Sequence, residues 1–165
     1  MRTNMRPKSF ADGIVLSILT VMLLAATADV PAAVLTSSVT IPVAGIVNGL
    51  PESVSLSGSV TIVSRLSSDP LLGEAMRNRL TIKLVNVSGV GMTSGRSYVA
   101  TGENTMMRLG SISDQFGVMF PFYRNTAAGP MAARSAMVSI TLKVDLLSGA
   151  IGGATASVST PRLGG

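Results

Sequence analysis

Residues 53–66 read SVSLSGSVTIVSRL, an alternation in which nearly every second side chain is large and apolar. The even positions carry five such side chains: Val54, Leu56, Val60, Ile62 and Leu66. The odd positions are serine and threonine apart from Val63 and Arg65. A period of two predicts a β-strand with one buried and one solvated face, which is typical of antiparallel sheets. Gly58 stands on the inner phase and indicates a bend or bulge.

The same period recurs further along the chain. Residues 137–146, MVSITLKVDL, alternate as cleanly, and residues 116–122 place Phe116, Phe120 and Phe122 on one phase. We expect these phenylalanines at the centre of the core. Residues 79–88 change apolar phase near Leu84–Val85, which predicts a β-bulge. Weaker strands are expected at 36–47, 97–101, 104–112 and 153–159, and Pro42 suggests that the first of these lies at an edge.

The connections predict an all-β domain without crossover helices. Turn residues occur at 48–51 and 148–149, and two longer loops are expected at 67–78 and 124–135. Asp69-Pro70 in the first loop favours one or two helical turns. About eight strands with such connections favour an antiparallel β-sandwich over 29–160, with a small β-barrel as the alternative. Residues 161–165 are expected to form a disordered tail.

The N-terminus has the pattern of a signal peptide over residues 1–28. Basic residues at Arg2, Arg6 and Lys8 precede the apolar stretch 13–26, and small residues allow cleavage after Ala28 or as late as Ala32. The apolar stretch is shorter than a membrane-spanning helix requires, so the chain would meet a membrane through this segment only if it stayed uncleaved. We therefore expect an exported protein of bacterial type: periplasmic, cell-surface or extracellular.

The composition argues against most enzyme chemistry. The chain has no histidine and no cysteine, which removes histidine-based triads, thiolate nucleophiles and the usual transition-metal ligands. We therefore predict no catalytic, cofactor-binding or metal-binding residues and a non-enzymatic protein. Without disulfides, an exported domain must be stable through packing alone. The net charge is +5, part of which belongs to the leader, and this mild excess does not indicate nucleic-acid binding.

The arginines are the remaining candidates for a site. They flank the two expected loops or lie in a glycine-rich turn: Arg77, Arg79, Arg96, Arg124 and Arg134. If the loops share one end of the domain, these side chains form an anion-binding surface, because guanidinium groups match phosphate and carboxylate oxygens. The partner would be an envelope protein, a glycan or another anionic surface.

Three functions follow from these patterns. The first is a binding or envelope-associated module that uses its loops. The second is a structural subunit that self-assembles through an edge strand, with 36–47 as the candidate. The third is a carboxylate-based hydrolase, which needs two acids close together among Asp69, Glu74, Glu103 and Asp114.

Overall fold

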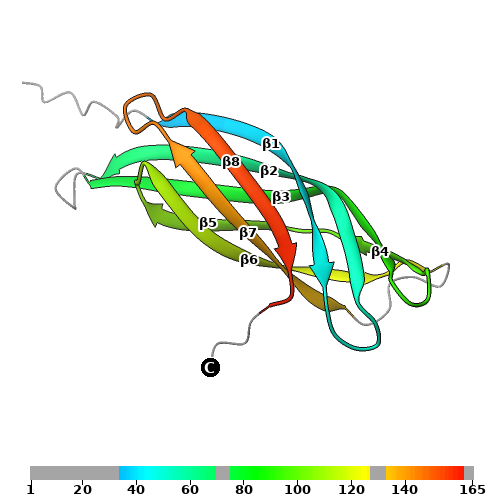
Figure 1. Ribbon diagram of the computed structural model, residues 1–165. Helices are drawn as coiled ribbons and strands as arrows, with labels where there is room; N and C mark the ends of the chain where they lie inside the picture. The colour runs from blue at the N-terminus through cyan, green and yellow to red at the C-terminus, as the bar shows by residue number, and fades with distance from the viewer. Residues whose placement is uncertain (1–33, 70–74, 127–132, 162–165) are drawn as a thin grey trace, which may run out of the picture. The chain divides into compact units, whose positions relative to one another are not determined.

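A computed structural model describes residues 34–69, 75–126 and 133–161, which belong to one compact unit, Pro31–Gly165. This part of the chain contains strands, turns and connecting segments but no helix, so the all-β prediction is confirmed (Figure 1). The strands are β1 (Leu35–Val47), β2 (Val54–Asp69), β3 (Ala75–Gly91), β4 (Ser97–Ala100), β5 (Glu103–Leu109), β6 (Ser113–Arg124), β7 (Arg134–Val144) and β8 (Ile151–Ser159).

The strands form one sheet that closes on itself. Its order is β2-β1-β8-β7-β6-β4-β3, and pairing of β2 with β3 joins the two ends into a seven-stranded barrel. The remaining strand, β5, follows β4 in the sequence and pairs with β3. All neighbours are antiparallel except β1 and β8, which meet in parallel at Gly45 and Val158. The expected sandwich is therefore not confirmed, and the alternative, a small barrel, fits. Inward–outward alternation is the same in both architectures, so it does not distinguish them.

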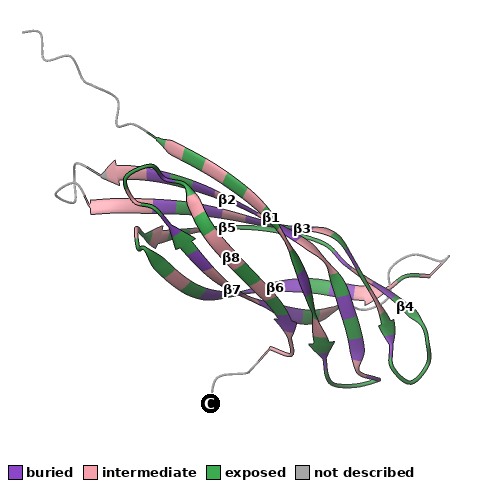
Figure 2. Cartoon of the chain, turned by 45° about the horizontal axis from the view of Figure 1, so that its top comes forward, coloured by how far each residue is buried: buried purple, intermediate pink, exposed green. Residues whose placement is uncertain are grey.

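The barrel interior is the hydrophobic core. Buried and exposed residues alternate along the strands (Figure 2). The even residues of β2 and β7 that were expected inside are buried, and so are Phe116, Phe120 and Phe122. One polar pair lies among them: the Ser64 hydroxyl donates to Oδ1 of Asn78 at 2.8 Å, and both side chains are buried.

A β-bulge interrupts the β2–β3 ladder near its middle. The register shifts between Ser57 and Ser59, and Asn86 on β3 adopts a φ of 51°. A β-carbon at Gly58 would collide with the backbone of Val87, so only glycine fits opposite the bulge. The bulge predicted at Leu84–Val85 is confirmed close to that position, and it moves the inward phase from Leu84 to Val87.

Both long loops are shorter than predicted. β2 continues to Asp69 and β3 begins at Ala75, so most of 67–78 is paired strand, and residues 70–74 lie outside the described residues. β6 likewise runs to Arg124 and β7 begins at Arg134, with 127–132 outside the described residues. Serine, asparagine and arginine obscure the alternation there, but the backbone ladder continues through them.

The expected edge strand is also different. β1 pairs with β2 along its whole length and is bridged to β8 on its other side at Gly45–Val158, so 36–47 is joined on both sides and is not a free edge. β5 pairs with β3 alone among the described strands, so one of its sides is unpaired. Between β5 and β6 the described residues form no backbone ladder. Instead, Nε and Nη2 of Arg108 donate to the two carboxylate oxygens of Asp114 at 2.8 and 2.6 Å.

Arg108 and Asp114 stand on the inward phases of β5 and β6. The Arg108 guanidinium lies 5.7 Å from the centre of the Phe116 ring. The pair therefore covers the core along the boundary between β5 and β6, where no backbone ladder forms; we call this boundary the seam.

The predicted signal peptide at 1–28 and the last four residues of the predicted tail lie outside the described residues. In the part of the chain that is described, no helix is long and apolar enough to cross a membrane.

Candidate functional site

A buried carboxylate, Glu52, organises one end of the barrel. It follows Pro51 in the β1–β2 loop and is only 8% exposed. Its carboxylate accepts hydrogen bonds from the backbone N–H groups of Thr93 and Ser94 at 3.1 and 2.8 Å, from the Ser94 hydroxyl at 2.5 Å and from the Tyr98 hydroxyl at 3.0 Å. These donors, the Ser94 hydroxyl first, lower the pKa of Glu52 from its ordinary value of 4.5 to about 2.

The local sequence makes this arrangement possible. Gly91 ends β3 against the Glu52 side chain, where a β-carbon would collide with the carboxyl group. Gly95 has a φ of +67° and turns the chain back toward β4. The Met92 N–H also donates to the carbonyl of Ser53 at 2.9 Å. The β1–β2 and β3–β4 loops are thus held together as one unit.

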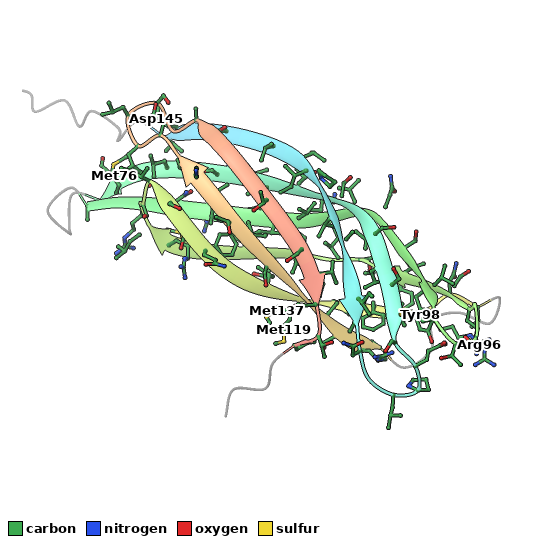
Figure 3. All side chains as sticks on the ribbon, viewed as in Figure 1. Met76, Arg96, Tyr98, Met119, Met137 and Asp145 are labelled. Carbon is green, nitrogen blue, oxygen red and sulfur yellow. The ribbon has the colours of Figure 1, made fainter. Side chains whose placement is uncertain are left out.

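A cavity of about 250 Å³ lies at this end of the barrel. It is lined by Pro51, Arg96, Tyr98, Phe122, Tyr123, Arg124 and Arg134. Figure 3 shows Arg96 and Tyr98 near each other at this end, with Asp145 at the opposite end. The described lining therefore combines aromatic residues with three arginines and includes no acidic residue. We call this cavity the arginine pocket.

Arg134 is held in place by two hydrogen bonds and a ring contact. Its Nη1 donates to the Glu52 carbonyl at 2.8 Å and its Nη2 to the Asn48 carbonyl at 3.2 Å. Its guanidinium stacks 4.9 Å from the centre of the Phe122 ring. Because both acceptors are neutral carbonyls, these bonds orient the guanidinium without neutralising its charge.

Arg96 and Tyr98 complete the pocket in different ways. Arg96 is exposed, and its guanidinium makes no hydrogen bond or ion pair within the described residues. Tyr98 is buried and packs against Phe122 with ring centres 6.0 Å apart. Burial, followed by the contact with Glu52, raises the pKa of Tyr98. The phenol is therefore a neutral donor that fixes the loop carboxylate.

With this geometry defined, the chain can be compared with known proteins. No protein family model, curated protein or solved structure matches it. The chemistry of the arginine pocket is therefore inferred from its own residues.

The five predicted arginines divide into two groups. Arg96, Arg124 and Arg134 line the arginine pocket, whereas Arg77 and Arg79 stand near the start of β3. A strand advances about 3.3 Å per residue, so Arg79 lies roughly 40 Å along β3 from its end at Gly91. The structure brings three of the five together, and it pairs Arg79 with Arg65 on the outer face of the β2–β3 ladder.

The predicted hydrolase acids do not come together in the described part of the chain. Glu103 lies on the exposed phase of β5, whereas Asp114 points inward and binds Arg108. Glu74 and the side chain of Asp69 lie outside the described residues. The described residues also contain no group of three or more acids that could hold a metal ion.

Sequence reasoning missed the two groups that shape this end, Glu52 and Tyr98. They are 46 positions apart, and no spacing connects them. The available signal was the glycine-rich turn 89–95, whose backbone N–H groups at Thr93 and Ser94 bind the Glu52 carboxylate. The ion pair of Arg108 and Asp114 was also missed, because Asp114 was considered only as a candidate hydrolase acid and no pattern connects it to Arg108.

Proposed function

We propose that this domain is a non-enzymatic exported binding module whose arginine pocket takes an anionic group. The observation that carries the proposal is the convergence of Arg96, Arg124 and Arg134 on one cavity without a carboxylate in its described lining. Guanidinium groups bind phosphate, sulfate and carboxylate oxygens through charge-assisted hydrogen bonds. The envelope partners expected from the sequence, an anionic glycan or an acidic protein among them, carry such groups.

The size of the cavity narrows the ligand. About 250 Å³ is smaller than the typical pocket for a drug-sized molecule and suits one anionic headgroup or sugar ring. Phe122 and Tyr123 supply an apolar wall on which a ring or methylene segment can lie. We therefore favour an anion attached to a small organic group over a bare ion.

The pocket chemistry supports binding rather than catalysis. Glu52 is held as a carboxylate by four hydrogen bonds, and its low pKa makes it a weak base. The Tyr98 hydroxyl donates a hydrogen bond to Glu52 and its pKa is raised, so it stays protonated and is not a nucleophile near neutral pH. The groups nearest the arginines thus maintain the shape of the pocket.

Export is part of the proposal and rests on the basic and apolar pattern of residues 1–28. Expression in a bacterial host followed by intact mass of the exported fraction tests it. An N-terminus at Asp29 or Ala33 is the expected result, and retained Met1 would contradict it.

Ligand binding is tested with phenyl phosphate as the probe. Calorimetric titration should show binding to the wild-type chain that weakens as salt is raised, because charged contacts are screened. Arg96→Gln should weaken binding by about tenfold, since a hydrogen bond to a charged group contributes about 1.5 kcal/mol or more. Arg79→Gln is the matched control, because Arg79 is exposed at the other end of β3. Equal effects of the two variants, or no binding by the wild type, would contradict the proposal.

Self-assembly is a second candidate, favoured by the incomplete pairing of β5. Met107, Leu109 and Ile112 are exposed on and beside this strand. If two copies pair there, light scattering should show concentration-dependent oligomers that Met107→Lys disperses. A monodisperse wild-type monomer at millimolar concentration would exclude it.

A further inference from the structure

The loops that form the arginine pocket also carry exposed apolar tips. Leu50 is 91% exposed and directly precedes Pro51, and Met92 is 61% exposed in the same turn as Arg96. Because Met92 donates its N–H to Ser53, the two tips belong to the unit that Glu52 holds together. The end of the barrel thus presents apolar side chains beside cationic ones.

The solvent-accessible charge at this end has one sign. Glu52 is buried against Tyr98 and the Ser94 turn, so its carboxylate is shielded from solvent. The other acids of known side-chain position belong elsewhere: Glu103 on β5, Asp114 at the start of β6 and Asp145 at the opposite end (Figure 3). Among the described residues, the solvent-accessible charges beside the tips are therefore the arginines of the pocket: Arg96 is exposed, and Arg124 and Arg134 are partly exposed.

We propose that Leu50, Met92 and the arginine pocket form a docking surface for an anionic lipid bilayer. This inference rests on the proposed function, because a lipid phosphate would be the anion that the pocket takes. Exposed apolar tips insert into the interfacial region, while neighbouring arginines bind headgroup phosphates. An acidic soluble partner would use the arginines but would give no reason for two protruding apolar side chains in water.

The loop unit suits this task because it is preorganised. The hydrogen bonds to Glu52 and the stacking of Arg134 on Phe122 fix the tips and the pocket before a ligand arrives. Little ordering is needed on docking, so less of the binding free energy is lost. The pocket would hold one headgroup while the tips lie beside its acyl chains.

Tryptophan scanning tests the proposal at single positions, because the chain contains no native tryptophan. Leu50→Trp and Leu147→Trp are a matched pair: both sites are more than 90% exposed, and Leu147 shares the turn of Asp145 at the opposite end. The full chain is titrated with vesicles of phosphatidylcholine alone and with about one third phosphatidylglycerol. The two tryptophans distinguish docking through the β1–β2 loop, which affects only position 50, from any membrane affinity of the N-terminal leader.

The expected result is a blue shift of Leu50→Trp with phosphatidylglycerol vesicles, quenching by brominated lipid, and no shift for Leu147→Trp. In vesicle sedimentation, Arg96→Gln should weaken binding about fivefold, the effect of one basic residue near an anionic surface. Leu50→Ser should weaken it about tenfold, as expected for one lost apolar anchor. An unchanged Leu50→Trp spectrum, or the same shift for both reporters, overturns the inference.

Phenyl phosphate separates this inference from the proposed function. If it binds the pocket while the vesicles leave Leu50→Trp unchanged, the anion site stands and bilayer docking fails. If the vesicles shift Leu50→Trp but phenyl phosphate does not bind, the surface docks without a discrete anion site. Capture of an acidic soluble protein by Arg96 without an effect of Leu50→Ser would also overturn bilayer docking.

Discussion

Gly91 lies so close to Glu52 that a β-carbon at position 91 would overlap the whole carboxyl group. The end of β3 and the β1–β2 loop therefore pack so closely that there is no room for a side chain at position 91. Gly91→Ala must displace either the strand end or the carboxylate, and we expect a loss of about 1–3 kcal/mol in the free energy of unfolding.

Chemical denaturation of Gly91→Ala measures this loss. Gly152→Ala on β8 is the control, because a β-carbon there meets no atom within 4 Å. The control should stay within about 0.5 kcal/mol of the wild type. Equal stability of the two variants would show that the Glu52 contact does not constrain Gly91.

The pKa of Glu52 predicts how the stability of this loop unit depends on pH. Its folded pKa of about 2 is below its ordinary value of 4.5, so the stabilisation is fully present above pH 4.5 and is lost as pH falls toward 2. Glu52→Gln should therefore be less stable than the wild type at neutral pH, and the difference should shrink across that interval.

Thermal melts between pH 2 and pH 7 check this dependence. Glu103→Gln, which changes an exposed carboxylate on β5, should run parallel to the wild type. The lowered pKa values of Asp114 and Asp145 leave some acid sensitivity in every variant. A gap between wild type and Glu52→Gln that is constant with pH would contradict the role assigned to the carboxylate.

Arg108 and Asp114 should stabilise the seam modestly. Arg108 is 39% exposed and Asp114 18%, so solvent screens their attraction. A double-mutant cycle with Arg108→Gln and Asp114→Asn should give a coupling free energy of about 0.5–1 kcal/mol. Hydrogen exchange should also speed up at β5 in either single variant. Additive effects with unchanged exchange would mean that the pair does not hold the seam.

The buried pair Ser64–Asn78 should show an asymmetry between single and double substitution. Ser64→Ala leaves a buried amide oxygen without its donor, and we expect it to cost about 1–3 kcal/mol. Adding Asn78→Val removes the orphaned group and should recover part of that loss. Urea unfolding measures both variants. A double variant less stable than Ser64→Ala would show that Asn78 has a further structural role.

Much of the fold could be predicted because side-chain alternation is a local property. The inward set of β2 and the phenylalanines of β6 were identified from the period of two, and the β3 bulge from a change in that period. Closure of the barrel could not be predicted, because it depends on which strands pair. The β1–β8 contact joins Gly45 to Val158 and leaves no mark on either segment.

The site was predictable only in part for the same reason. Arginine chemistry indicated an anion surface, but the separation of Arg79 from Arg96 follows from the length of β3, whose ends were underestimated. Glu52 was missed because its donors come from a distant turn. The sequence can indicate which side chains are suited to binding anions, but the pairing of the strands decides which of these side chains come together.

The parallel contact of β1 with β8 has a consequence for the order of folding. The β2–β3 hairpin connects neighbouring segments, so its loop-closure entropy is small and it can form early. β1 gains its second neighbour only when the last strand of the chain arrives. A nascent chain therefore exposes the open side of β1 until its C-terminus is available, and strand exchange between copies is favoured in that interval.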